Sequence, residues 1–276
     1  LRTVPIIPME KELSFFSLSI LRKKDIYYLT ELYNNKDYKI LIKKSYLLLK
    51  EFYNSSLLFN FIGAAYQALE DFEEARKNYL FALRINPNFA EANFNLGVVL
   101  YKLNRSNESI FYFSRAIHEN QKFVEAFFYS GILFDKLKNK KLSIEYYYRT
   151  IQLKPDHINA SINLGNKLVE IGSYEIALNI YKYALLLEDN NEKLLYNLAN
   201  LLYRLEFFDE AYIHYKSVLK LNKEHKSAFH IKNSIEGKKV KTAPKEYVLN
   251  LFDKYAINFE DELVKRLQYK APSELF

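Results

Sequence analysis

The chain has 276 residues, of which 49% are hydrophobic, and its 40 Lys and Arg against 33 Asp and Glu give a net charge of +7. It contains no cysteine, which excludes disulfides, thiolate metal sites and cysteine nucleophiles and is typical of a reducing, cytoplasmic location. No stretch reaches the roughly 20 apolar residues that a transmembrane helix needs, so we expect no membrane span. The positive charge is spread thinly along the chain, which argues against a nucleic-acid partner.

The first segment, residues 1–21, carries a cluster of apolar residues that includes Phe15, Phe16 and Leu18. A secretory signal peptide is not indicated, because Lys11 and Glu12 precede the cluster and no small-residue cleavage site follows it. We therefore predict a lead-in helix that covers the beginning of the next segment.

The central segment, residues 22–225, has a period of 34 residues. Four of the six glycines lie 34 residues apart, and Ala199 stands where a fifth would fall: Gly63, Gly97, Gly131, Gly165. At this period the segment divides without insertion into six rows: 22–55, 56–89, 90–123, 124–157, 158–191 and 192–225. A fixed period of this length indicates one helical hairpin that is copied and stacked.

The row 56–89 shows the hairpin most clearly. Its apolar and small residues fall at helical spacing in two groups, which are Phe59, Ile62, Gly63 and Tyr66, and then Ala75, Tyr79 and Ala82. Asp71 and Glu74 form a capping-box pattern at the start of the second group, and Pro87 ends the row. The pattern predicts two antiparallel helices per row.

These rows resemble the tetratricopeptide repeat family. The glycine series occupies one of the family's small positions. A second series of small residues occupies another: Ala75, Ser109, Ser143, Ala177, Ala211. Four residues after each of these lies an aromatic residue, and together they form a column: Tyr79, Phe113, Tyr147, Tyr181, Tyr215. The resemblance implies an all-α fold, an α-solenoid of six tetratricopeptide helical hairpins in a right-handed superhelix, with the aromatic column in the core. It also implies that a polypeptide partner binds in the concave groove, which the first helix of each pair lines. An RNA-binding helical array is a weaker alternative, and the constant 34-residue spacing argues against it.

The first row departs from the pattern. Leu29, Leu41 and Leu48 occupy its three small positions. We therefore predict that its two helices pack more loosely or at a shifted angle.

Asparagines recur at one phase of the first helices. At about 100° per residue, a side chain two positions before the small residue points about 200° away from the packed partner helix. Asn95, Asn163 and Asn197 occupy this position, and Asn166 and Asn200 lie three residues after the last two. A side-chain amide can donate to and accept from a peptide backbone of any sequence, and the repeat arrays of protein glycosyltransferases hold extended substrates in this way. These five residues are our candidate peptide-binding ladder, although asparagine in so Asn-rich a chain is also explained as a solvated polar residue.

Other binding modes find less support. Aromatic residues near the same face are candidate anchors for apolar side chains, although partial core packing also explains them: Phe94, Tyr101, Phe128, Tyr196, Tyr203. The dicarboxylate clamp for chaperone tails is not indicated, because Asn60 and Ala64 are followed by Phe94 and Val98 rather than by cations. The histidines form no pair at metal-binding spacing, and His157 and His225 share one slot between rows, so we expect surface loop residues, no metal site and no catalytic residue.

The end of the chain breaks the period. For residues 226–242 we predict a capping helix, around Phe229 and Ile231, and a basic linker. The helical segment 243–276 resembles the leading segment of class I S-adenosylmethionine-dependent methyltransferases through these anchors in order: Tyr247-Val248, Leu251-Phe252-Asp253, Tyr255-Ala256, Phe259, Leu263-Val264, Tyr269, Pro272. The resemblance implies an alternative function, a substrate-presenting arm of a longer methyltransferase. We expect no cofactor in this chain itself, because the last glycine is Gly237 and no glycine-rich turn follows it.

Overall fold

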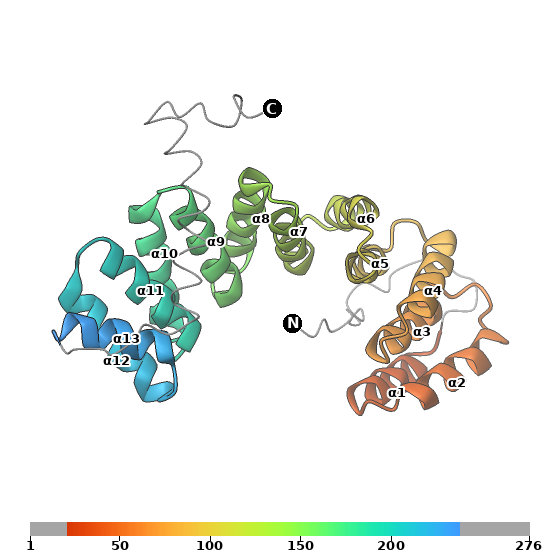
Figure 1. The fold of residues 1–276 in the computed structure, drawn as a ribbon. Coiled ribbons are helices and arrows are strands. Elements are labelled where there is room, and N and C mark those ends of the chain that lie inside the picture. Colours follow the sequence, from red (N-terminus) through yellow and green to blue (C-terminus); the bar gives the residue numbers. More distant parts are fainter. Residues whose placement is uncertain (1–20, 238–276) are drawn as a thin grey trace, which may run out of the picture. The chain divides into compact units, whose positions relative to one another are not determined.

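The computed structural model describes residues 21–237, and this part of the chain forms thirteen α-helices and no β-strand (Figure 1). The helices are α1 Lys23–Asn34, α2 Tyr38–Leu49, α3 Ser56–Ala68, α4 Phe72–Ile85, α5 Ala90–Lys102, α6 Ser106–Glu119, α7 Val124–Lys136, α8 Lys140–Leu153, α9 Ile158–Glu170, α10 Tyr174–Leu187, α11 Glu192–Arg204, α12 Phe208–Leu221 and α13 Lys226–Ile235. Consecutive helices pack as hairpins, α3 with α4, α5 with α6, α7 with α8 and α11 with α12. The all-helical prediction is confirmed.

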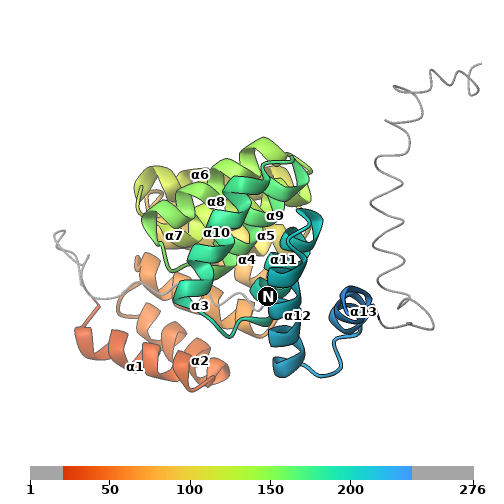
Figure 2. The same cartoon turned by 90° about the vertical axis from the view of Figure 1, so that its left-hand side faces the viewer.

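The helices keep the 34-residue register of the sequence. Helices α3, α5, α7, α9 and α11 begin at residues 56, 90, 124, 158 and 192, the first residues of the rows. Helix α13, which packs against α12 (Figure 2), begins one further period on, at Lys226, and so starts before the Phe229 of the predicted capping helix. The predicted lead-in helix, the end of the linker and the segment 243–276 lie outside the described residues. No helix within 21–237 is long and apolar enough to cross a membrane.

The chain divides into two compact units, and the boundary between Ala160 and Ser161 falls inside α9. The described part of the N-terminal unit, residues 21–160, contains α1 to α8. The described part of the C-terminal unit, residues 161–237, contains most of α9 and all of α10 to α13.

In both units the repeat glycine lies against the aromatic ring of its own hairpin. A Cβ atom added to Gly63 would lie 2.7 Å from Cε1 of Tyr79, and Gly165 faces the ring of Tyr181 in the same way. Both rings are almost completely buried, so they have no free space into which they can move away. The prediction that small residues permit close approach and that the aromatic column is core is confirmed.

In the first hairpin the large residue and the small residue stand at opposite positions to those in the other hairpins. Leu29 takes the glycine position, and Ser45 takes the position that an aromatic ring holds in the other hairpins. Both residues are completely buried, as is Leu41. The leucine thus brings back volume that the missing ring removes, a compensation that we did not anticipate when we predicted looser packing.

The turn inside each of the six hairpins contains a residue with left-handed backbone at one fixed position. These residues have φ between 57° and 81°: Lys36, Glu70, Asn104, Lys138, Gly172, Glu206. The N–H of the next residue donates to a carbonyl of the first helix at 2.8 to 3.0 Å, as in a Schellman turn. The same bond explains why the capping box is incomplete. Asp71 Oδ1 accepts from Glu74 N at 3.2 Å, but Asp71 N already donates to Tyr66 O, and the Glu74 carboxylate pairs with Lys77.

Candidate peptide-binding site

The C-terminal unit places four of the predicted asparagines on two helices, Asn163 and Asn166 on α9 and Asn197 and Asn200 on α11. All four side chains are half-buried. The hydroxyl of Tyr181 donates to Asn166 Oδ1 at 2.5 Å, and that of Tyr215 donates to Asn200 Oδ1 at 2.8 Å. A buried phenol needs a hydrogen-bond partner, so two of these asparagines also serve the core.

A direct amide bond joins the two helices. Asn197 Nδ2 donates to Asn166 Oδ1 at 3.0 Å, so this oxygen accepts from Tyr181 and Asn197 together. Because both donors approach the oxygen, the Asn166 amide is held in one orientation, and its nitrogen has no partner among residues 21–237. Asn163 makes no hydrogen bond to this part of the chain. We call these four residues, Asn163, Asn166, Asn197 and Asn200, the amide cluster.

Asn95, the fifth predicted residue, does not join them. It lies on α5, where its Nδ2 donates to Asn60 Oδ1 on α3 at 3.1 Å, and both side chains are completely buried. Every residue of α5 from Ala92 to Leu100 is buried, so this helix has no open face there. The completely buried amide of Asn95 is therefore closed to a peptide, which removes Asn95 from the predicted ladder. Helical phase alone does not reveal what packs against a helix.

Comparisons with known proteins match part of the repeat segment to known families. Residues 63–104 match the family described as TPR repeat, and residues 90–122 match the one described as tetratricopeptide repeat. Residues 63–122 of the chain thus match tetratricopeptide repeats. A search of curated protein sequences finds no match.

Several solved structures share the fold. YrrB, described as a TPR protein with an unusual peptide-binding site, is 19% identical in sequence and has a TM-score of 0.60. The match covers 68% of this chain and 97% of the YrrB chain. MamA from Desulfovibrio magneticus RS-1 is 19% identical in sequence and has a TM-score of 0.56. The match covers 62% of this chain and 97% of the MamA chain. A chain of the Cut9–Hcn1 assembly of the APC/C is 18% identical in sequence and has a TM-score of 0.56. The match covers 76% of this chain and 42% of that chain. At these identities the likeness establishes the α-solenoid fold alone.

The aromatic residues expected near the tetratricopeptide groove fall into two groups. Phe94 and Phe128, on α5 and α7, are buried in the core of the N-terminal unit, so core packing explains them and an anchoring role does not. Tyr101 is half-buried beneath the ammonium group of Lys136, which lies 4.8 Å from its ring centroid. Tyr196 and Tyr203 on α11 are also half-buried, and they are the aromatic residues that accompany the amide cluster in the C-terminal unit.

The two histidines between tetratricopeptide rows cap helices, a role that we did not predict. His157 Nδ1 accepts from Ala160 N at 3.1 Å, and His225 Nδ1 accepts from Ala228 N at 3.2 Å. Each ring packs on an aromatic ring at the equivalent position, Phe128 at 4.4 Å and Tyr196 at 4.5 Å between centroids. Burial lowers the pKa of His157 below its ordinary value. No group of residues within 21–237 is arranged to hold a metal ion.

Proposed function

We propose that the chain is a protein-interaction scaffold that binds an extended polypeptide segment along the amide cluster of its C-terminal unit. Tetratricopeptide repeats support an interaction scaffold in general. The observation that carries the specific site is the shared oxygen of Asn166, which fixes two amides from neighbouring hairpins relative to each other.

A fixed amide suits backbone recognition for a physical reason. An extended peptide exposes one N–H and one C=O per residue, and a side-chain amide can pair with both. Tyr181 and Tyr215 hold the oxygens of Asn166 and Asn200 from the core side, so part of the ordering cost is met before a peptide arrives. Such a site selects for extended backbone rather than for a particular sequence. The described peptide-binding site of YrrB supports a polypeptide ligand for this fold.

The test is a binding assay with peptides selected from a random library against the full chain. Asn163→Ala is the informative variant, because Asn163 bonds to no described residue and its loss leaves the hydrogen bonds of Asn166, Asn197 and Asn200 in place. We expect Asn163→Ala with Asn197→Ala to weaken binding by about fivefold per lost hydrogen bond. Asn179→Ala is the matched control, because Asn179 is an exposed asparagine on α10 of the same unit. Undiminished affinity of the double variant would remove the amide cluster from the binding site.

The methyltransferase alternative rests on the segment 243–276, which lies outside the described residues. Neither matching family model reaches this segment, since they cover residues 63–104 and 90–122, and S-adenosylmethionine would belong to a longer parent protein. Reading the coding sequence beyond Phe276 tests it directly. A glycine-rich turn within the next few tens of residues supports a methyltransferase, whereas a stop codon or a glycosyltransferase sequence removes it.

A further inference from the structure

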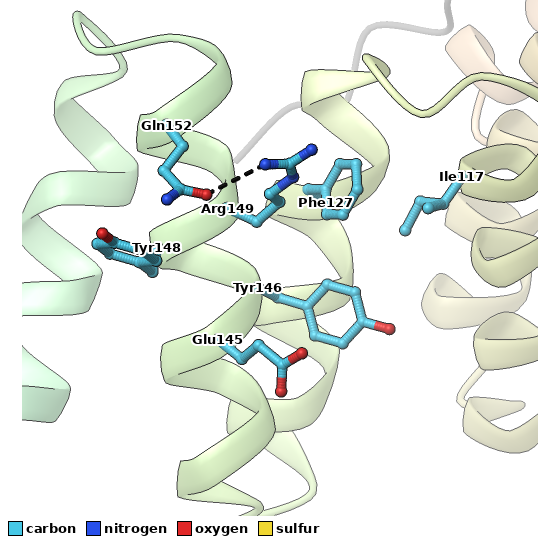
Figure 3. A pocket seen from close by; sticks show the side chains of 7 residues that line it. All are labelled: Ile117, Phe127, Glu145, Tyr146, Tyr148, Arg149 and Gln152. Atoms are coloured by element: carbon cyan, nitrogen blue, oxygen red, sulfur yellow. Dashed lines mark hydrogen bonds between the residues drawn. The ribbon is translucent and has the colours of Figure 1, made fainter.

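The N-terminal unit contains a pocket that shares no residue with the amide cluster. It has a volume of about 370 Å³ and is lined by residues of three helices, Ile117 of α6, Phe127 of α7, and Glu145, Tyr146, Tyr148, Arg149 and Gln152 of α8 (Figure 3). Two rings form its apolar wall, since the centroids of Phe127 and Tyr146 lie 6.1 Å apart. Tyr146 is held from behind by stacking on Phe134 at 5.3 Å. Ring contacts on Phe127 and Phe134 therefore hold Tyr146 in an aromatic wall.

Arg149 lies at the edge of this wall and has no acidic partner in the part of the chain that the structure describes. Its guanidinium carbon is 5.9 Å from the centroid of Phe127, and its Nη1 donates to Gln152 Oε1 at 3.2 Å. Within residues 21–237 no carboxylate lies within 4.0 Å of it, although Glu145 stands one turn earlier on the same helix. The equivalent residue of the preceding repeat, Arg115, instead bonds to Pro87 O and Asn88 Oδ1. Arg149 thus keeps most of its donors for a ligand.

Charge and exposure indicate what the ligand is. Residues 21–160 hold 21 Lys and Arg against 15 Asp and Glu, an excess of 21 − 15 = 6 positive charges that attracts an acidic partner. Four of the seven lining residues are exposed, so the pocket can bury one side chain but cannot enclose a free small molecule. A ligand of this pocket therefore needs further contacts with the protein surface around it. A polypeptide segment can make such contacts, whereas a free small molecule cannot.

We infer that this pocket binds a partner-protein segment in which an aromatic side chain is followed by a carboxylate. The aromatic ring packs between Phe127, Tyr146 and Ile117, and the carboxylate accepts hydrogen bonds from Arg149. Glu145, at the other end of the wall, disfavours a second acidic group there and so sets the direction of the segment. The site lies in the N-terminal unit, so it is independent of the amide cluster in the C-terminal unit.

The experiment measures binding of synthetic hexapeptides to the full chain by nuclear magnetic resonance titration. The parent probe is Gly-Ser-Phe-Asp-Ser-Gly with both ends blocked, and its relatives replace Asp by Asn or Phe by Ala. The protein variants are Arg149→Gln and the control Arg84→Gln. The control removes the same charge from an exposed arginine whose guanidinium carbon also lies 5.9 Å from a ring centroid, that of Phe81, on α4.

We expect the unmodified chain to prefer the Asp peptide over the Asn peptide by about fivefold, as for a partly exposed ion pair. Arg149→Gln should abolish this preference, and Arg84→Gln should keep it. The proposal is overturned if the preference survives in Arg149→Gln, or if the Phe-to-Ala peptide binds as well as the parent. It is also overturned if free phenylalanine binds as tightly as the hexapeptide, because the pocket would then hold a small molecule.

Discussion

The two units use one 34-residue frame to present different surfaces. The position that carries Asn166 and Asn200 in the C-terminal unit carries Val98 and Ile132 in the N-terminal unit. Residues 161–237 hold 9 Lys and Arg against 10 Asp and Glu, a net charge of 9 − 10 = −1, whereas residues 21–160 have a net charge of +6. The N-terminal unit thus combines positive charge with an aromatic pocket, and the C-terminal unit combines near-neutrality with amides.

The comparison separates what the fold requires from what it leaves free. Both units bury a large aromatic residue against a glycine or alanine and close each hairpin with a left-handed residue. The polar residues on the first helices differ between the units without any change of register. Binding specificity in this array therefore resides in positions that the packing does not fix.

The largest expected effect is the loss of a core aromatic residue from either unit. Tyr147→Ala in the N-terminal unit and Tyr215→Ala in the C-terminal unit should each lower the free energy of unfolding by about 3 to 5 kcal/mol, because each ring is almost fully buried. Chemical denaturation followed by circular dichroism measures the loss. Tyr148→Ala, at a residue that is 52% exposed, is the control and should cost far less. If only one of the two substitutions lowered the free energy of unfolding, the aromatic residue would not have an equivalent role in the cores of the two units.

A smaller effect is expected at the left-handed turn residues. Glu70→Gly in the N-terminal unit and Glu206→Gly in the C-terminal unit should each raise the free energy of unfolding by about 1 kcal/mol, because glycine adopts positive φ without a Cβ clash. Gly172→Ala should lower it by a similar amount, since no atom lies within 4 Å of the added Cβ and only the backbone conformation is strained. Thermal denaturation measures all three variants. A destabilised Glu70→Gly would show that its side chain contributes more than the backbone strain costs.

The sequence predicted the repeat frame well because that frame depends on local size constraints. Gly63 and Tyr79 are sixteen residues apart in one hairpin, so their contact can be inferred from spacing alone. Asn95 could not be placed in this way, because its burial depends on α3 of the preceding repeat. The pocket at Arg149 was also missed, since it is built from three helices and no single helix carries its pattern. The left-handed turns had a readable signal in Gly172, which we did not use.

The smallest effect concerns pH and the cap of α9. His157 accepts the N–H of Ala160 only when Nδ1 is unprotonated, and burial lowers the pKa of His157 in the folded chain below its ordinary value of 6.5. Below pH 6.5 the unfolded chain therefore binds the proton more readily than the folded chain. The stability contribution is complete above pH 6.5 and is lost as the pH falls toward the lower folded pKa. His157→Asn keeps a capping acceptor that does not titrate, so its unfolding free energy should depend less on pH below 6.5 than that of the unmodified chain. Denaturation curves of the variant and of the unmodified chain, recorded over a series of pH values from 6.5 downward, measure the difference. Equal pH dependence of the two proteins would mean that the His157 cap of α9 does not respond to protonation.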